Sequence, residues 1–408
     1  MFRLPAFFMA LFICVSSPAQ RTIKGRVVNN VTGSPVGGCS VFITNTSKGT
    51  TTDNSGNFIL NDLPAGKHDL IISSIGYETN VFSFSDAELP LQLKIELRIK
   101  VKEMENVTLE PSVEEGWDKW GKTFMDNFAG TTGNASQCKI KNEKAIRFRY
   151  YKKSNRLTAY CDEPILLENK ALGYVISYQL EDFEMNFKEG SVAYMGYSLF
   201  TETGKEGNTP KQKWIKGREK AYNGSIMHFM RSLYANKLLE EGFEVRKMQR
   251  LPNLEKERVR IAYSAARKTR KDSITGNMIL EYALPGDSLN YYQQVMKQDN
   301  YKELIGADIL NADSLIIFEK EGYKILGFDD YIYVTFKKEL EDADYLVTQY
   351  PPRRATFQRS YVLLLGDKFI SLDKSGNYYN PQHFLTSAYW GWDEKMSNSL
   401  PLDYEPGR

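Results

Sequence analysis

Ser288, within Gly286-Asp-Ser-Leu289, is the residue whose setting comes nearest to that of a catalytic nucleophile. A serine attacks a carbonyl group only when a base lies within hydrogen-bond reach and a third group orients that base. The chain holds three histidines, namely His68, His228 and His383. Catalysis at Ser288 therefore depends on a fold that brings one of them close.

The surroundings of these histidines do not indicate metal chemistry. The sequence contains no HExxH, HxH or CxxC motif, and it has no phosphate-binding loop or dinucleotide fingerprint. A zinc-binding His-x-x-Glu needs a glutamate three residues after a histidine, where this chain has Ile71, Arg231 and Thr386. We therefore expect no metal and no cofactor.

The letters around Ser288 resemble the nucleophile motif of the GDSL hydrolases. That family supplies Asp-x-x-His near its C-terminus, where this chain has Asn380-Pro-Gln-His383, and it places the nucleophile near the start of the chain. Pro285-Gly-Asp-Ser is also an ordinary turn composition. A GDSL-like esterase at Ser288 stays an alternative, beside a glycosidase that uses two carboxylates. Asp and Glu are too common for spacing to identify such a pair.

The stretch Tyr389-Trp-Gly-Trp392 holds the best candidates for binding. If Tyr389, Trp390 and Trp392 are exposed, they form a stacking platform for a sugar ring or a peptide. If they are buried, they close the core of the domain that contains them. We favour burial, because a large aromatic side chain rarely stays exposed without a reason.

Composition and charge narrow the class of protein. Apolar residues make up 42% and charged residues 25%, as in globular proteins generally, and aromatic residues reach 13%, which favours strands. The 53 basic residues nearly balance the 51 acidic ones, so there is no electrostatic case for nucleic acid. The basic cluster at 266–271 is interpreted as a solvated loop.

The N-terminus has the features of an export signal. Arg3 precedes an apolar run at 6–15, and Ser17-Pro-Ala19 supplies the small residues that signal peptidase recognises, so we place the cut after Ala19. A lipoprotein would use Cys14, but Ile13 before it is too bulky for the usual motif. No later apolar run approaches 18 residues, so we expect no transmembrane helix in the mature chain.

Three cysteines follow the predicted cut: Cys39, Cys138 and Cys161. An odd number gives no complete disulfide framework. Cys138 and Cys161 could pair in an oxidising envelope. If residues 152–155 turn one hairpin, however, these two positions do not face each other, so buried free thiols are favoured.

Residues 20–97 read as short strands separated by turns, at 22–29, 39–44, 57–60, 68–73, 79–85 and 91–97, which predicts a β-sandwich. The stretch 47–60 reads as a tight hairpin. In its turn Asp53 can accept hydrogen bonds from backbone amides ahead of it, and Gly56 can take a positive φ. Asp373-Lys-Ser-Gly-Asn-Tyr378 repeats this composition, which indicates turn geometry. A calcium loop is disfavoured because 53–57 offers one carboxylate.

This segment resembles the carboxypeptidase regulatory-like domain family. The residues that carry the resemblance are Gly25, Val27, Pro35, Gly49, Thr50, Thr52, Asp53, Gly56, Phe58, Ile75, Gly76, Tyr77 and Glu78. The resemblance implies a transthyretin-like sandwich of about seven strands without catalytic residues. Such modules often stand at the front of envelope proteins, so it also implies the periplasm or the outer membrane of a Gram-negative cell.

Beyond a linker at 98–112, residues 113–408 are predicted to form an α+β domain with a mostly antiparallel sheet. Ser112-Val-Glu-Glu115 has capping-box spacing and predicts a helix that ends at Gly130. In 171–187 the apolar alternation slips by one residue, which predicts a bulge near Glu181-Asp182. A helix is predicted at 225–242, with Ser225 as its N-cap. Strands are predicted at 314–320, 331–339 and 344–350, with a further pair around 363–381.

The fold class is therefore mainly β, with an N-terminal sandwich and a larger α+β domain whose layout resembles an uncharacterised envelope-protein extension. We expect a non-catalytic, exported cell-envelope protein that binds a protein or a polysaccharide, with no nucleic-acid partner. An envelope hydrolase, using Ser288 or a carboxylate pair, is the alternative.

Overall fold

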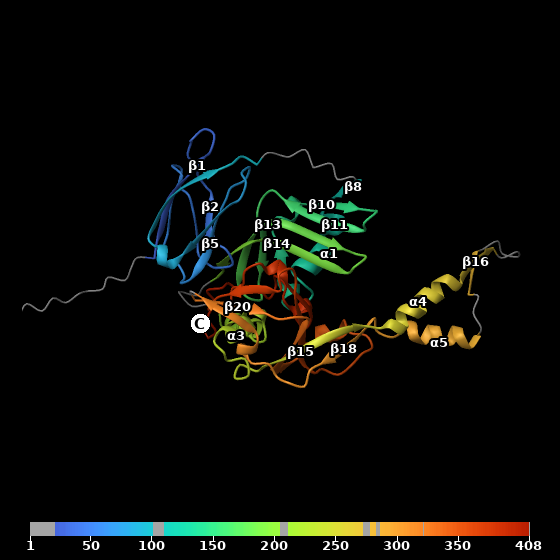
Figure 1. Ribbon diagram of the computed structural model, residues 1–408. Coiled ribbons are helices and arrows are strands. Elements are labelled where there is room, and N and C mark those ends of the chain that lie inside the picture. The colour runs from blue at the N-terminus through green and yellow to red at the C-terminus, as the bar shows by residue number, and fades with distance from the viewer. Residues whose placement is uncertain are drawn as a thin grey trace, which may run out of the picture.

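A computed structural model describes residues 21–100, 110–204, 211–271, 278–282, 286–320 and 322–407 (Figure 1). The predicted signal peptide at 1–19 and most of the linker lie outside these ranges. The chain forms a β-rich body from which one long arm projects, drawn in yellow and orange in Figure 1. The mainly β class and the order of sandwich and larger domain are as the sequence predicts.

The first β-domain is a sandwich of seven strands, blue in Figure 1. One sheet has the order β3 (Gly49–Thr51), β2 (Ser40–Ile43), β5 (Lys67–Ser73) and β6 (Asn80–Ser85); the other has β4 (Asn57–Leu60), β1 (Ile23–Asn29) and β7 (Leu91–Leu97). Only the pairing of β1 with β7 is parallel among these strands. Alternate apolar residues such as Val27, Val41 and Leu70 are fully buried between the sheets, each contributing about 1.5–3 kcal/mol.

The turn at 53–57 has the predicted chemistry but a different topology. Asp53 Oδ1 accepts hydrogen bonds from the backbone N–H groups of Ser55 and Asn57, and Gly56 has φ +77°. The prediction of a hairpin is wrong, because β3 pairs with β2 whereas β4 pairs with β1. The turn carries the chain from one sheet of the sandwich to the other.

The first half of the second domain is a seven-stranded sheet covered by helix α1 (Trp117–Phe128). Its strands are β8 (Ser112–Glu115), β9 (Cys138–Ile140), β10 (Ile146–Tyr151), β11 (Arg156–Cys161), β12 (Ile165–Asn169), β13 (Tyr174–Asn186) and β14 (Ser191–Glu202). Phe124 and Phe128 of α1 are fully buried, and Phe124 packs 4.8 Å, centroid to centroid, from Phe183. The predicted aromatic stripe is therefore core, and the predicted helix end before Gly130 is confirmed.

Two local predictions in this sheet have opposite outcomes. The register of β13 with β14 shifts between Leu180 and Asp182, which confirms the bulge. The capping box is wrong, because Ser112–Glu115 pairs with β10 as an edge strand and α1 starts only after Gly116. The free edge of β10 offers backbone partners that a sequence pattern cannot reveal.

The second half is built on a five-stranded sheet and a three-stranded sheet. The order of the larger is β18 (Tyr301–Ile305), β15 (Phe243–Pro252), β21 (Tyr331–Leu340), β22 (Phe357–Leu364) and β24 (Phe384–Ala388); that of the smaller is β19 (Ile316–Lys320), β20 (Tyr323–Gly327) and β23 (Phe369–Leu372). The two strands predicted around 363–381 are present as β22 and β23, and they belong to different sheets. Helices α2 (Gln212–Tyr222), α3 (Ile226–Tyr234), α6 (Ala343–Val347) and α7 (Tyr389–Asp393) complete this half.

Two predictions of secondary structure fail here for local reasons. The segment predicted as a strand at 344–350 begins with α6, because Asp342 Oδ1 caps it by accepting from the N–H of Asp344. The helix predicted at 225–242 starts at the expected Ser225 cap but ends at Tyr234, since Asn236 takes a left-handed φ of +57°.

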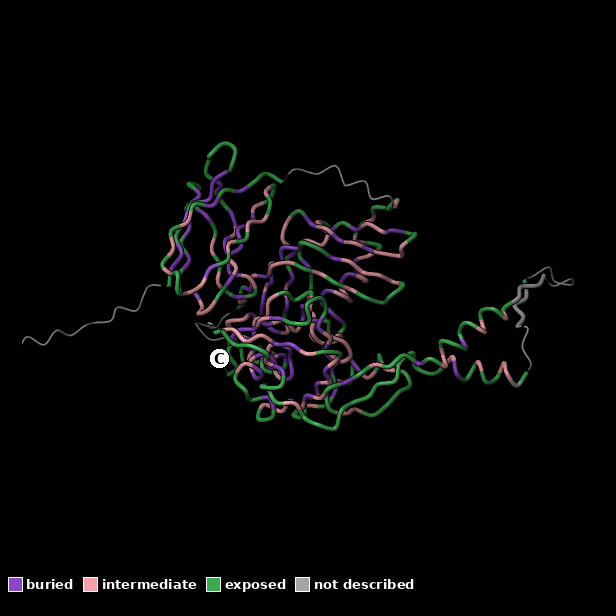
Figure 2. The backbone as a smooth tube through the Cα atoms, in the orientation of Figure 1, coloured by how far each residue is buried: buried purple, intermediate pink, exposed green. Residues whose placement is uncertain are grey.

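The arm runs outward from β15 and β18 (Figures 1 and 2). It consists of helices α4 (Leu254–Ala266) and α5 (Gly286–Met296), with the two-stranded ribbon β16 (Arg267–Lys271) and β17 (Met278–Tyr282) at its far end. The basic cluster at 266–271 thus includes a strand and is not only a loop. Within the described residues, no helix has the length and apolar character needed to cross a membrane.

The first β-domain is docked on the second. Ser73 Oγ donates to Gln179 Oε1 at 3.0 Å, and Ser198 Oγ donates to Asn45 Oδ1 at 2.8 Å. Thr46 is fully buried in this contact and forms a β-bridge with Leu199 of β14. Paired, buried polar groups hold the two domains in one defined orientation.

Candidate functional site

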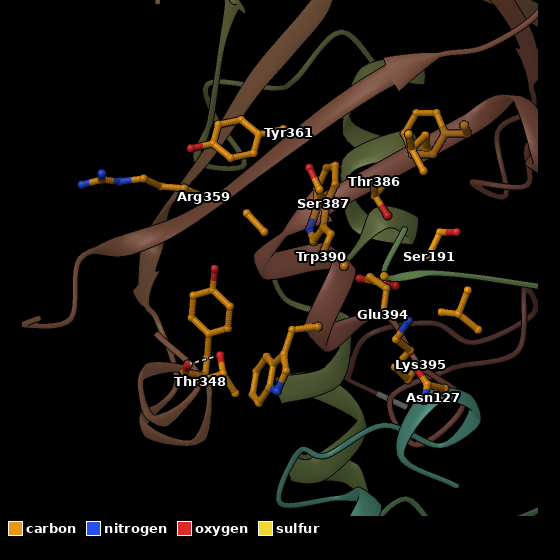
Figure 3. Close-up of a pocket in the computed structure, with 18 of the residues that line it drawn as sticks. Asn127, Ser191, Thr348, Arg359, Tyr361, Thr386, Ser387, Trp390, Glu394 and Lys395 are labelled. Carbon is orange, nitrogen blue, oxygen red and sulfur yellow. Dashed lines mark hydrogen bonds between the residues drawn. The ribbon is translucent and has the colours of Figure 1, made fainter. Parts of the chain in front are cut away.

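A cavity of about 1220 Å³ lies between the five-stranded sheet, helices α6 and α7, and the start of β14 (Figure 3). We call it the aromatic pocket. The rings that line it are Tyr194, Tyr331, Tyr345, Tyr361, Phe384, Trp390 and Trp392. Concave sites lined by aromatic side chains and a few polar groups are the usual form of ligand-binding sites.

One wall of the aromatic pocket is a face of the sheet. Ile332 of β21 and Val362 of β22 are paired and lie in the core, so the residues next to them along each strand point to the opposite face. On that face Tyr361 of β22 lies across from Ser387 of β24. Arg359 precedes Tyr361 by two residues on β22 and therefore shares this face. Figure 3 shows Arg359 and Tyr361 extending from the same strand.

An arginine fixes the tyrosines of this wall. The guanidinium of Arg250 lies 4.8 Å from the ring centroid of Tyr331 and 4.9 Å from that of Tyr361. Glu303 accepts from both Arg250 Nε and the Tyr361 hydroxyl, at 3.1 and 3.0 Å. The cation–π contacts and the shared carboxylate hold both rings in place.

The opposite wall comes from α6 and α7. The rings of Tyr345 and Trp392 lie 5.4 Å apart, and Trp392 Nε1 donates to Thr131 Oγ1 at 3.0 Å. The indole is half-buried, so one part packs against Tyr345 while the rest faces the aromatic pocket. Trp392 is thus a ring with a fixed orientation and an accessible surface.

The predicted aromatic trio divides between core and pocket. Tyr389 and Trp390 are only 5% and 2% exposed. Trp390 packs against Phe229, 5.3 Å between centroids, and its Nε1 donates to the carbonyl of Gly224 at 2.7 Å, although one side of it reaches the pocket. Burial therefore describes Tyr389 and Trp390, and binding by Trp392 stays a prediction.

Three successive charged residues stand at the end of α7: Asp393 is its last residue, and Glu394 and Lys395 after it line the aromatic pocket. Glu394 Oε1 accepts from the N–H of Ile226 at 2.8 Å, and Asp393 Oδ1 accepts from Asn398 Nδ2 at 2.7 Å. Burial raises the pKa of Asp393 to about 7, and burial together with the neighbouring Asp393 raises that of Glu394 to about 8. Burial lowers the pKa of Lys395. Glu394 is therefore largely protonated at neutral pH and can donate a hydrogen bond.

A second cavity of about 550 Å³ adjoins the aromatic pocket. The two share the lining residues Tyr194, Met195, Pro381, Gln382, Phe384, Thr386 and Glu394. Asn45 of the first β-domain reaches this second cavity. Its volume is within the range of sites for small molecules.

Ser288 lies in the first turn of α5 on the arm. The histidines lie elsewhere: His68 on β5, His228 on α3, and His383 just before β24. In the described part of the chain no hydrogen bond joins a histidine to Ser288; His228, for example, bonds Gly224 and Glu241. Among the described residues, the structure therefore does not pair this serine with a histidine.

Neither metal ligands nor disulfides occur among the described residues. They hold no group of three or more His, Cys, Asp or Glu side chains able to bind a metal ion. Cys39, Cys138 and Cys161 are free, and burial raises the pKa of Cys138 to about 12. Cys138 and Cys161 lie on β9 and β11, which are not neighbours in the sheet. Burial also raises the pKa of Cys161, so the thiolate form of Cys138 and of Cys161 is disfavoured.

Sequence reasoning missed most of the wall residues, namely Arg250, Tyr331, Tyr345, Arg359 and Tyr361. The available signal was alternation: in the stretch 331–336 aromatic and aliphatic residues alternate, so the tyrosines had to occupy the face opposite the core. That face becomes a pocket wall only because α6 and α7 pack beside it.

Comparison with known proteins supports the assignment of the first domain. Residues 23–109 match the CarboxypepD_reg-like domain family. The N-terminal domain is therefore a carboxypeptidase regulatory-like domain, as its sequence predicts. No curated protein matches the chain.

Three solved structures that the chain resembles are distant matches. One matching chain belongs to a mutant type II cohesin–X-dockerin complex from Acetivibrio cellulolyticus. It is 25% identical, over 19% of this chain and 57% of that chain, with a TM-score of 0.17. A putative membrane-associated protein of unknown function from Bacteroides fragilis is 10% identical, over 86% of this chain and 93% of that chain, with a TM-score of 0.15. A putative carbohydrate binding protein from Bacteroides uniformis is 12% identical, over 47% of this chain and 82% of that chain, also with a TM-score of 0.15.

Proposed function

We propose that this chain is an exported, non-catalytic cell-envelope protein that binds a glycan in the aromatic pocket. The observation that carries the proposal is the pair of facing walls. Tyr331 and Tyr361 are fixed on the sheet, and Tyr345 and Trp392 stand on the helices opposite. Rings held in this way present flat apolar surfaces on which sugar rings can stack.

The polar lining favours a glycan over a protein partner. The lining also includes hydrogen-bonding side chains, among them Gln382 and, labelled in Figure 3, Asn127, Ser191, Thr348, Thr386 and Ser387. Sugar hydroxyls both donate and accept hydrogen bonds, as amide and hydroxyl side chains do. A protein partner would more often meet a flat surface with an apolar centre.

We infer export from the signal-like N-terminus and from the frequent occurrence of carboxypeptidase regulatory-like domains at the front of envelope proteins. In this proposal the first β-domain supports the binding domain. Its Asn45–Ser47 loop packs on β14, and residues 191–195 at the other end of that strand line the aromatic pocket.

The test is a binding measurement on the mature chain, residues 20–408, against a glycan array followed by calorimetry. Trp392→Ala and Tyr361→Ala should each weaken binding roughly 10-fold or more, as loss of a central aromatic anchor does. Tyr350→Ala is the matched control, because Tyr350 is 95% exposed and lies outside the aromatic pocket. If no glycan binds, or if the Tyr350 variant loses as much affinity as the others, the proposal fails.

A second candidate function is glycoside hydrolysis. The observation that favours it is Glu394, a carboxyl group in the pocket with a raised pKa, as a general acid needs. Reducing-sugar release from a bound glycan, abolished in Glu394→Gln, would establish this activity. A bound glycan that stays intact through prolonged incubation would exclude it.

A further inference from the structure

We infer that the aromatic pocket takes an acidic glycan and that Arg359 binds its anionic group. The inference rests on the proposed function and names the class of ligand. It depends on where the charges of the lining are placed and on which of them already have partners.

Two of the four cationic residues of the lining are neutralised by a neighbour. Arg353 forms two hydrogen bonds to Glu341, at 2.6 and 2.7 Å. Arg250 pairs with Glu303 at 3.0 Å. These arginines are bound in place and leave no net charge for a ligand.

Arg359 differs from both. Its side chain is exposed, and its guanidinium has no hydrogen-bond or ion-pair partner among the residues that the structure describes. It stands near the start of β22, where it pairs with Thr335 of β21, and the pairing of β22 with β24 begins at the next residue, Ser360. An unpaired guanidinium on a rigid strand has the planar pair of donors that a carboxylate, sulfate or phosphate accepts.

The spacing of Arg359 and Tyr361 suits a charged sugar. Residues two apart on a strand share a face and lie roughly 7 Å from each other. A sugar ring stacked on Tyr361 would therefore carry a ring substituent, or place that of the next unit, at the guanidinium. Figure 3 shows both side chains extending from β22 on the same side of the pocket.

The acidic residues of the lining do not cancel this charge. Glu341 is occupied by Arg353, and Asp126 pairs with Lys122 at 2.5 Å. Glu394 accepts the N–H of Ile226 and is largely neutral, since burial raises its pKa, and Lys395 lies beside it. The aromatic pocket therefore presents excess positive charge to its ligand.

The test compares acidic oligosaccharides with neutral counterparts of the same length. Mature chain is titrated by calorimetry with oligogalacturonate and its carboxyl-reduced form, and with sulfated and unsulfated dextran oligomers, at low and high salt. We expect at least one acidic member to bind roughly 10-fold more tightly than its neutral partner, as a charge-assisted bidentate contact allows. Arg359→Gln should remove that difference without changing the affinity for the neutral form.

Arg354→Gln is the matched control, because Arg354 is also exposed but does not line the pocket. Preference for the sulfated or for the carboxylated oligomer identifies the anion, and either supports the inference. Equal binding of acidic and neutral forms, or an unchanged preference in Arg359→Gln, overturns it and leaves the proposed function standing. Absence of binding to all four oligomers and to the glycan array overturns both.

Discussion

Asp403 holds Ser47 through two hydrogen bonds, one from the backbone N–H at 2.8 Å and one from the hydroxyl group. Beside them the N–H of Leu402 donates to the carbonyl of Asn45 at 2.7 Å. A segment near the end of the chain thereby fastens the loop of the first β-domain that packs on β14. The two domains are joined by the C-terminal segment as well as by the linker.

Replacing Asp403 with alanine should loosen this loop. Both hydrogen bonds to a charged acceptor are lost, at an exposed site, so we expect a loss of about 1 kcal/mol or less in global stability. Hydrogen exchange at the Ser47 amide should quicken markedly. An Asp367→Ala variant, in an exposed turn, serves as the control; equal exchange rates at Ser47 in both variants would contradict the role of Asp403.

Replacing Arg231 with methionine should destabilise the second domain more strongly. Its guanidinium donates to the carbonyls of Ser375, Leu402 and Tyr404, at 2.7, 3.0 and 3.0 Å. Losing these bonds leaves half-buried carbonyls unpaired, at a cost of about 2–4 kcal/mol. Chemical denaturation measures the change. Arg354→Met removes an exposed arginine and should shift the midpoint little; similar midpoints for both variants would show that the three bonds contribute nothing.

Trp390 and Trp392 should respond differently to substitution by phenylalanine. Trp390→Phe removes the bond to Gly224 and leaves a cavity in the core, so we expect about 2–3 kcal/mol of destabilisation. Trp392→Phe should change the unfolding free energy by less than about 1 kcal/mol and weaken glycan binding instead. Thermal unfolding and calorimetry on both variants separate the two effects. If Trp390→Phe instead weakened glycan binding and Trp392→Phe instead destabilised the fold, the glycan-binding ring would be Trp390.

Stability should fall as the pH rises from about 5 to about 8. Burial raises the folded-state pKa of Glu394 to about 8, so the folded protein favours the neutral carboxyl. The folding stability that the raised pKa of Glu394 contributes is fully present below the unfolded-state pKa. It is lost as the pH rises through the folded-state pKa. Asp393, with a pKa of about 7, acts in the same direction over a lower window.

The variant Glu394→Gln tests the assignment to this residue. It cannot ionise, so its unfolding free energy should decline by at least about 1 kcal/mol less than that of the natural chain between pH 5 and pH 8.5. Denaturant midpoints at a series of pH values provide the measurement. Glu189→Gln, in an exposed turn, should retain the full decline. A profile for Glu394→Gln that matches the natural chain would assign the dependence to other groups.

Local chemistry made the first β-domain predictable. Its strands alternate clearly, and Asp53 and Gly56 specify their turn through hydrogen bonds within five residues. The bulge at Leu180–Asp182 was likewise visible as a slip in apolar alternation. In the first β-domain and at this bulge, features that depend on neighbours in sequence were predicted correctly, apart from the pairing of β3 and β4.

Pairing between distant segments was less accessible. Ser112–Glu115 has the composition of a helix start, yet the edge of β10 draws it into a sheet. The arm was missed because α4 and α5 bury few residues of their own, Val259 and Val295 among them, so their apolar periodicity is weak. The aromatic pocket combines strands, helices and loops from across the second domain, and only Trp390 and Trp392 of its rings stood out in the sequence.

Ser47 and Asp403 are 356 residues apart in the sequence, so their hydrogen bonds can form only long after Ser47 has been synthesised. At about 5–20 residues per second, a ribosome needs roughly 20–70 s to pass from one to the other. During that interval the first β-domain exists without the partner of its loop, so its own sandwich core has to keep it folded. The hydrogen bonds from Ser47 to Asp403 and from Leu402 to Asn45 form only after that interval.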